Sequence, residues 1–470
     1  MSFTARLDAL PGVRAVPAEQ VRQALRTAAR VAFLDDDPTG TQTVRDLPVL
    51  TRWSVEDVRW ALRQDTAGFF VLTNTRSLAP EQAAERDREV VGACLAAAEE
   101  EGVRLVLASR GDSTLRGHFP LETDVIGEVI ADRGGRVDGV VLAPAYTDAG
   151  RVTVDGVHWL RSPDGLVPVA DSEFARDATF GFRSSRLADW VAEKSAGRIP
   201  ADRVTALTID AIRRGTTESL RERLAGVRGG RVAVLDAVED DDLRAAVLAI
   251  LAEEESGASF VYRIGPSFVR ARVGQAAHPP LAPEWLAALT RTGTHGLLVV
   301  GSHVGLTSGQ LARLAERRPF TAVELDVPAV LDDERAEDHI SAAVAAATAA
   351  LGDGLVVLST SRTLVRGDDE AASLGIARRV SAALTQAAGR IVAARRPAFV
   401  VAKGGITSSD VATGALGIDR AWARGSLLPG IVSLWEPVAG PAVGLPYVVF
   451  AGNVGDRDSL ADVVERLEQA

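Results

Sequence analysis

Short apolar runs alternate with amphipathic segments along the chain. In the first 150 residues these runs are rich in β-branched and aromatic side chains and stop at turn residues, which is typical of buried strands. The predicted strands are 31–34, 47–50, 68–72, 103–108 and 138–142. Between them, residues 54–64 and 80–101 carry the start signals of helices. Strands and helices that alternate at this spacing predict an α/β fold with a mostly parallel sheet.

The same pattern returns in the second half of the chain. A Pro- and Ala-rich stretch at 274–283 has no hydrophobic periodicity and is typical of a linker. Before it lie predicted strands at 204–208, 231–235 and 259–263. After it, a helix is predicted over 307–317, and strands at 296–300, 321–325, 355–359, 398–402 and 448–450. The sequence therefore predicts two Rossmann-like α/β domains with mostly parallel sheets, 1–273 and 284–470.

Three carboxylates, Asp35, Asp36 and Asp37, follow the first predicted strand, and Pro38 and Gly40 set a tight turn after them. Ligands of open α/β sheets bind beyond the carboxyl ends of the strands. Adjacent carboxylates repel one another unless a cation, a metal or a substrate hydroxyl offsets the repulsion. A helix cap needs one aspartate, not three. The turn therefore indicates a binding site, with a polar cap as the alternative.

Polar residues follow the next strands as well, at 73–77, 110–118 and 144–151. Parallel strands bring such ends to one edge of a sheet. Asp112, Arg116 and Arg110 give this edge a mixed charge. Arginine binds a carboxylate through paired hydrogen bonds, and carboxylates accept hydrogen bonds from hydroxyls. The edge therefore suits a small polyhydroxy acid. A purely structural ion pair between Asp112 and an arginine is the alternative.

Small and hydroxyl residues follow three strands of the second half, at 301–310, 403–410 and 451–455. Free backbone N–H groups at such turns can hold phosphate groups. Each turn alone could equally be only a turn. Lys403 is one of two lysines in the chain, which favours a role for it.

Composition narrows the function classes. The net charge of −11 over 470 residues argues against general nucleic-acid binding, which requires basic patches. The single cysteine, Cys94, and six scattered histidines argue against a disulfide and a metal site. There is no P-loop, no GxGxxG after the first strand, no membrane-length apolar run and no signal-peptide pattern. We therefore expect a cytoplasmic protein that acts on a small molecule away from membranes and nucleic acid.

Several motifs together resemble the four-carbon acid sugar kinase family, in the family's order and over nearly the whole chain. In the first half they are DDPTG at 36–40, DSTLRG at 112–117, and Pro144-Ala145 with Gly150-Arg151. In the second half they are Gly301-Ser302 with Thr307 and Gln310, GGIT at 404–407, and GNVG at 452–455.

The resemblance implies an ATP- and Mg²⁺-dependent kinase that phosphorylates the terminal hydroxyl of threonate, erythronate or 3-oxo-tetronate, giving the 4-phosphate. The N-terminal domain would bind the sugar acid and the C-terminal domain the nucleotide. Asp37 is the first candidate for the catalytic base, then Asp36 and Asp112. The implied substrate-binding residues are Asp36, Asp37, Arg110, Asp112, Ser113, Thr114 and Arg116. The implied nucleotide-binding residues are Ser302, Thr307, Ser359, Gly404, Gly405, Thr407, Gly452, Asn453 and Gly455.

The chain departs from the family pattern at three places. Many relatives have Asp where this chain has Thr43 and Asn where it has His118, which leaves the sugar acid and its stereochemistry open. A lysine usual before the last Gly-Asn pair is missing, which bears on nucleotide binding. A homo-oligomer is compatible with all these features, and the oligomeric state stays open.

Two rival functions remain. Asp35-x-Asp37-x-Thr39 fits the motif of haloacid-dehalogenase-like phosphatases, with Asp35 as nucleophile and Asp37 as acid/base. A non-catalytic sugar-acid sensor with a degenerate kinase fold is the second rival.

Overall fold

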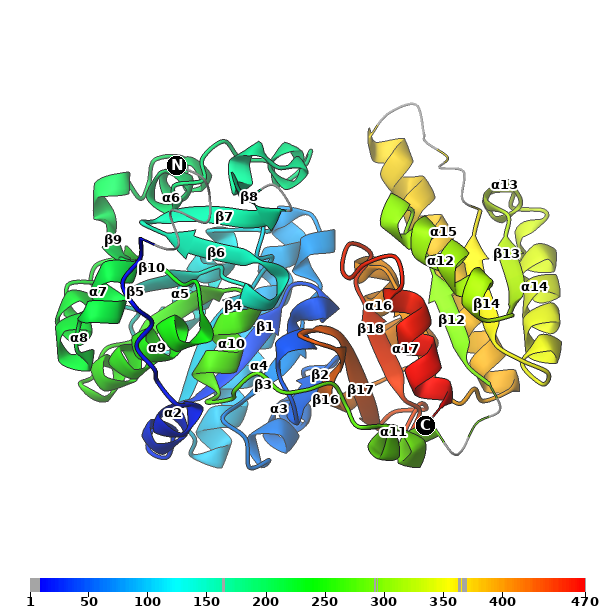
Figure 1. Ribbon diagram of the computed structural model, residues 1–470, viewed down its shortest axis with the longest axis horizontal. Helices are drawn as coiled ribbons and strands as arrows, with labels where there is room; N and C mark the ends of the chain where they lie inside the picture. The colour runs from blue at the N-terminus through cyan, green and yellow to red at the C-terminus, as the bar shows by residue number, and fades with distance from the viewer. Residues whose placement is uncertain are drawn as a thin grey trace. The chain divides into compact units, whose positions relative to one another are not determined.

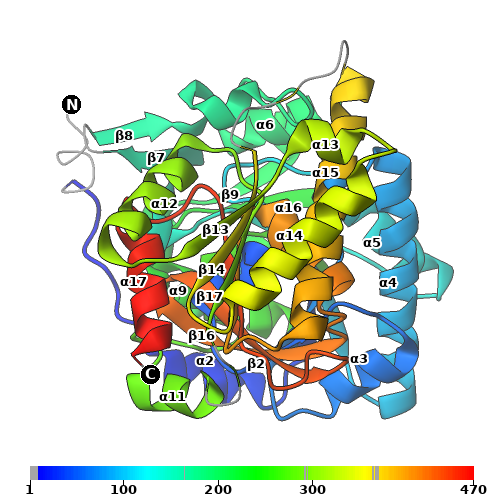
Figure 2. The same cartoon turned by 90° about the vertical axis from the view of Figure 1, so that its right-hand side faces the viewer.

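The computed structural model describes residues 9–162, 165–290, 293, 295–361, 365 and 370–469. The chain divides into two compact units, Met1–His278 and Pro279–Ala470, and both are drawn in Figure 1 and Figure 2. The main sheet of each unit is mostly parallel and is accompanied by helices. The predicted α/β class with mostly parallel sheets is therefore confirmed.

In the N-terminal unit the main sheet has the strand order β2-β3-β1-β4-β11-β5-β10-β9, and neighbouring strands are parallel. Strand β1 lies between β3 and β4, so the chain turns to opposite sides of β1 in succession. Such a switch point opens a ligand crevice at the carboxyl end of the strand. The strands are β1 (Arg30–Asp35), β2 (Leu47–Leu50), β3 (Gly68–Leu72), β4 (Leu105–Arg110), β5 (Gly139–Ala143), β9 (Val204–Leu207), β10 (Arg231–Leu235) and β11 (Phe260–Ile264).

The helices of this unit pack in two groups. The first contains α3 (Val55–Leu62), α4 (Pro80–Glu101) and α5 (Leu121–Asp132). In the second, four helices pack against α9 (Asp240–Glu255): α2 (Ala18–Leu25), α7 (Ile209–Arg214), α8 (Thr217–Ala225) and α10 (Pro266–Arg272). Helix α6 (Leu187–Lys194) also belongs to this unit.

Helix α4 shows why this sequence folds against the sheet. Val90, Val91, Cys94, Ala97 and Ala98 recur at helical spacing and are buried in one cluster with side chains of β1, β3 and β4. Burying each valine stabilises the fold by roughly 1.5 kcal/mol or more. The cluster fixes the strands whose ends carry the polar residues.

A second, antiparallel sheet was not predicted. It contains β6 (Arg151–Val154), β7 (Val157–Ser162) and β8 (Gly165–Pro168). It lies in the N-terminal unit, near its upper edge in Figure 1. Its strands are short and only partly buried, so they lack the continuous apolar runs that revealed the main strands.

In the C-terminal unit the strand order is β13-β14-β12-β15-β18-β17-β16. Neighbouring strands are parallel from β13 through β14, β12 and β15 to β18. The hairpin of β16 and β17 is antiparallel and joins the sheet through β18. Strand β12 lies between β14 and β15, which makes a second switch point. The strands are β12 (Leu297–Val300), β13 (Thr321–Leu325), β14 (Val356–Thr360), β15 (Val400–Lys403), β16 (Arg420–Leu428), β17 (Ile431–Ala439) and β18 (Tyr447–Phe450).

Helices lie on both sides of these strands. Figure 2 shows α12 (Gly305–Arg317) and α17 (Ser459–Glu468) on one side, and α14 (Ala336–Ala350) and α15 (Glu370–Ala394) on the other. The shorter helices are α11 (Pro283–Thr290), α13 (Val327–Leu331) and α16 (Gly405–Asp410). In the part of the chain that the structure describes, no helix combines the length and apolarity needed to span a bilayer.

Candidate functional site

Asp35, the last residue of β1, forms a buried ion pair with Arg110 at the end of β4. Arg110 Nε donates to Asp35 Oδ1, and Nη2 donates to the carbonyl of Asp37. Both side chains are 2% exposed. Burial raises the pKa of Asp35 to about 7, even though Arg110 favours the carboxylate. A Cβ at Gly40 would overlap this pair, so the turn closes tightly over it.

The second carboxylate, Asp36, is held by Arg76, which follows β3. Arg76 Nη2 lies 2.6 Å from Asp36 Oδ1, and Arg76 Nε donates to Oδ2 at 3.2 Å. Burial alone would raise the pKa of Asp36, but Arg76 and Arg110 outweigh burial and hold it below its ordinary value. Asp36 is therefore an ionised carboxylate whose hydrogen bonds go to the protein.

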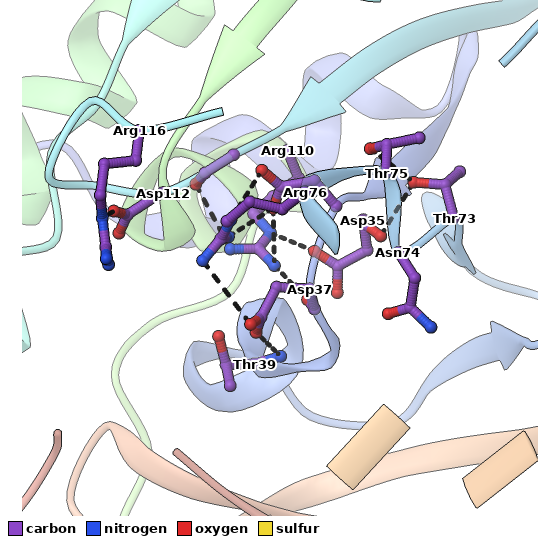
Figure 3. A network of polar contacts seen from close by, with 12 residues as sticks. Asp35, Asp37, Thr39, Thr73, Asn74, Thr75, Arg76, Arg110, Asp112 and Arg116 are labelled. Atoms are coloured by element: carbon purple, nitrogen blue, oxygen red, sulfur yellow. Dashed lines mark hydrogen bonds and ion pairs between the residues drawn. The ribbon is translucent and has the colours of Figure 1, made fainter. Parts of the chain in front are cut away.

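Asp37 is the carboxylate of the turn that remains accessible. Its side chain is 16% exposed, against 1% for Asp36. It accepts a hydrogen bond from the Thr39 backbone N–H at 2.8 Å, and its Oδ2 lies 3.6 Å from Arg76 Nη1. Figure 3 shows it between these two residues. This geometry fixes the carboxylate without burying it.

The segment after β4 brings further charges to the same sheet edge (Figure 3). Arg116 Nε donates to Asp112 Oδ2 at 2.7 Å, and the Thr114 hydroxyl donates to the same oxygen. Arg116 Nη1 also lies 3.6 Å from Asp177 Oδ2. Burial opposes ionisation of Asp112, but Arg116, Arg76 and Arg151 outweigh it, and its pKa lies well below its ordinary value. An Asp112–arginine ion pair is therefore present, and both partners stay partly exposed.

Arg263, the residue before the last of β11, supports this segment. Its Nη1 lies 2.5 Å from Glu122 Oε2 and 2.7 Å from Ser109 Oγ, and its Nη2 donates to the Arg116 carbonyl at 3.0 Å. At Gly117, where φ is +117°, a Cβ would lie 2.6 Å from Arg263 Nη2. Sequence reasoning missed this arginine, although a charge inside an apolar strand was a usable signal.

Two of the positions that depart from the family pattern make buried backbone contacts. Thr43 Oγ1 donates to the Pro266 carbonyl at 2.8 Å. His118 Nε2 lies 3.0 Å from the Thr75 carbonyl and 3.1 Å from that of Leu78. Ser113 and Thr114 are buried too. These side chains shape the loops that carry the accessible charges.

In the C-terminal unit three loops meet around Thr307. Its hydroxyl lies 3.1 Å from Ser302 Oγ and 3.2 Å from the carbonyl of Gly452. Gln310 extends this junction by donating to the Val454 and Asp456 carbonyls at 3.2 and 2.7 Å. The turns after β12 and β18 are therefore tied together.

The third loop follows β15. Gly404 has φ +128°, and a Cβ there would lie 3.0 Å from Thr407 Oγ1 and 3.3 Å from Ser302 Cβ. A Cβ at Gly452 would lie 2.6 Å from Ser302 Oγ. Glycine backbone and hydroxyl side chains thus line this junction together, which suits a phosphate cradle.

The other predicted nucleotide residues lie at the same sheet edge or in these loops. Ser359 of β14 pairs with Val300, the last residue of β12. Gly405 opens α16, while Asn453 and Gly455 are exposed after β18. Just beneath, Lys403 Nζ donates to the Ala451 carbonyl at 2.7 Å and lies 3.7 Å from the centre of the Phe450 ring. Burial lowers the pKa of Lys403 to about 7.

Comparison with protein families assigns each half a class of ligand. The family described as "Sugar-binding N-terminal domain" matches residues 31–272, and "Nucleotide-binding C-terminal domain" matches residues 297–460. The chain belongs to the four-carbon acid sugar kinase family. The resemblance that the motifs indicated is therefore confirmed.

Three curated proteins that are similar to this chain are named as kinases. It is 27% identical over 406 residues to D-threonate kinase of Salmonella typhimurium, covering 84% of this chain and 88% of that protein. It is 28% identical over 423 residues to D-threonate kinase of Bordetella bronchiseptica, covering 85% and 86%. The match to D-erythronate kinase of Heliobacterium modesticaldum, at 28% over 281 residues, covers 57% of this chain and about half (55%) of that protein.

Two solved structures share the fold of this chain. One, from Salmonella typhimurium, has a TM-score of 0.65 and 19% identity and covers 92% of this chain and 98% of its own. The other, from Haemophilus influenzae, has a TM-score of 0.60 and 17% identity and covers 93% and 99%.

Proposed function

We propose that this chain transfers the terminal phosphate of ATP to the terminal hydroxyl of a four-carbon sugar acid, giving the 4-phosphate. The observation that carries the proposal is the pair of sites: an edge of mixed charge in the sugar-binding domain and a cradle of glycines and hydroxyl residues in the nucleotide-binding domain. The proposed domains are residues 1–273 for the sugar acid and 284–470 for ATP, both Rossmann-like. Threonate and erythronate are the proposed substrates, by analogy with the named relatives.

Asp37 is the proposed base. The substrate hydroxyl oxygen forms a bond to the terminal phosphorus of ATP, the bond from that phosphorus to the bridging oxygen breaks, and the hydroxyl proton passes to Asp37. Its accessibility favours Asp37 over Asp36, which Arg76 holds, and over Asp112, which Arg116 holds. Phosphoryl transfer depends mainly on positioning and charge stabilisation, so the base accepts a proton late.

Roles differ among the proposed substrate-binding residues. Arg116, Asp112 and Asp37 are accessible enough to contact the sugar acid. Arg110, Asp36, Ser113 and Thr114 are buried and would position them. The burial of Asp35 and its pairing with Arg110 speak against a phosphatase that uses Asp35 as nucleophile.

The loops around Thr307 are proposed to hold the phosphates of ATP. The proposed residues are Ser302, Thr307, Ser359, Gly404, Gly405, Thr407, Gly452, Asn453 and Gly455. In the described part of the chain, no three His, Cys, Asp or Glu side chains form a metal site. Mg²⁺ commonly keeps water ligands and binds through substrate phosphates, so we assign it to the nucleotide, where it would neutralise phosphate charge. Dependence on ATP favours a cytoplasmic location.

The test is an assay of ADP release with Mg-ATP and a panel of tetronates and 3-oxo-tetronates. Turnover of one member, with a 4-phosphate product by mass spectrometry, would establish the function. Nucleotide binding by calorimetry without turnover of any member would favour the sensor. Release of phosphate from sugar phosphates without ATP would favour the phosphatase.

A further inference from the structure

Several arginines lie around the carboxyl edge of the N-terminal sheet, and four of them, near the acidic turn and the 112–118 loop, have a carboxylate partner. Arg110 pairs with Asp35, Arg76 with Asp36, Arg116 with Asp112, and Arg263 with Glu122. These ion pairs neutralise the four guanidinium groups within the protein. Arg151, the first residue of β6, differs from these four.

Arg151 makes no ion pair with any carboxylate among the described residues. Its guanidinium has one hydrogen bond there, from Nη1 to Ser113 Oγ at 3.1 Å. Two aromatic rings also lie near it: its Cζ is 5.6 Å from the centre of the Tyr146 ring and 6.0 Å from that of Phe174. Burial lowers the pKa of Arg151, and Asp112 only partly opposes this.

Arg151 is half-buried, and a partly desolvated guanidinium with no carboxylate in direct contact is costly unless other groups complete its hydrogen bonds. The fork of an arginine fits both oxygens of a carboxylate. Through Ser113, Arg151 also joins the loop that carries Asp112 and Arg116. The position therefore suits an anionic group on the ligand of this edge.

The backbone around Arg151 and a contact from β7 hold it in this position. Arg151 is the first residue of β6. Gly150 before it has φ +69°, and a Cβ added at Gly150 would lie 2.7 Å from Arg161 Cβ, so only glycine fits there without strain. His158 of β7 fixes the other side of the contact, because its Nε2 lies 2.7 Å from the Ser113 carbonyl. The small antiparallel sheet thus holds Arg151 against the 112–118 loop.

We propose that Arg151 binds the carboxylate of the sugar acid and is the residue by which this enzyme selects acids over neutral polyols. This rests on the proposed function. It gives the β6–β8 sheet a role in specificity, and with the carboxylate held by Arg151 the terminal hydroxyl is the opposite end of the substrate.

The test compares wild type with Arg151→Gln and Arg151→Lys, and with Arg161→Gln as the control from the same sheet, where the side chain is exposed. For the best tetronate, Arg151→Gln should raise KM at least tenfold and leave KM for ATP within twofold. Arg151→Lys should restore part of the loss, and Arg161→Gln should match wild type. The ratio of kcat/KM for the tetronate to that for the corresponding neutral tetritol should fall at least tenfold in Arg151→Gln only.

An unchanged KM and an unchanged acid-to-tetritol ratio in a folded Arg151→Gln, checked by thermal unfolding, would overturn the inference. Calorimetric titration with the tetronates separates this failure from failure of the proposed function. If wild type binds a tetronate without turnover, the function is wrong, and at least tenfold weaker binding by Arg151→Gln would still support the inference. If wild type binds no tetronate, the inference is overturned.

Discussion

His158 Nε2 lies 2.7 Å from the carbonyl oxygen of Ser113. Since a carbonyl only accepts hydrogen bonds, Nε2 carries the proton, and Nδ1 accepts from the Thr153 hydroxyl at 2.9 Å. Burial lowers the pKa of His158 to about 4. The neutral ring is therefore the native form, and it joins β7 to the loop of the proposed substrate site.

This histidine should make stability depend on pH. In the unfolded chain His158 takes up a proton below about pH 6.5, whereas the native protein resists until about pH 4. The unfolded state binds more protons in that window, so the free energy of unfolding should fall as pH decreases through it, by up to about 3 kcal/mol.

Urea unfolding of wild type and His158→Gln from pH 7 to pH 4.5 measures this contribution. The stability advantage of wild type should shrink as pH falls, because the variant lacks the titrating ring. A constant difference between the two proteins across the window would show that His158 does not carry the effect.

Replacing Asp37 by Asn should abolish most turnover and spare nucleotide binding. A general base contributes about 10²–10⁴-fold to the rate, and the amide keeps the size of the side chain. We expect kcat to fall at least a hundredfold, measured by ADP release, with ATP affinity by calorimetry unchanged. Asp132→Asn, at the exposed end of α5, is the control. Loss of ATP binding in Asp37→Asn would contradict the assignment of the nucleotide to the other domain.

The tight closure of the acidic turn gives a stability prediction. At Gly40 a methyl group would overlap Asp35 and Arg110, so Gly40→Ala should destabilise the protein by about 1–3 kcal/mol. Gly127 in α5 has nothing within 4 Å of an added Cβ, so Gly127→Ala should stabilise by up to about 1 kcal/mol. Thermal and urea unfolding of both variants check the contrast. Equal effects would show that the Asp35–Arg110 pair does not restrict Gly40.

The main strands could be predicted because parallel, doubly covered strands are continuous apolar runs. β1 and β3 are such runs, and the polar residues after them did converge at one edge. The sheet of β6 to β8 could not be predicted, because its partly exposed strands carry mixed side chains.

Which charged side chains pair within the site also could not be predicted from the sequence. The sequence pointed to Asp37 as the first candidate base and Asp36 as the second, but which carboxylate is buried depends on strand order, which places β4 beside β1. Arg76 and Arg151 stood in polar strand ends without any signal for their partners. Only the fold shows that Arg76 is paired and that Arg151 contacts Ser113.

The last prediction concerns the nucleotide cradle. Gly404 has φ +128°, which side-chain-bearing residues rarely adopt, and a Cβ there would press on Thr407 Oγ1 at 3.0 Å and Ser302 Cβ at 3.3 Å. Gly404→Val should therefore push these loops apart and weaken ATP at least tenfold by calorimetry, while the affinity for the sugar acid stays within twofold. Gly375→Val, in open space on α15, is the control. If Gly404→Val weakened both ligands equally, the two sites could not be separate.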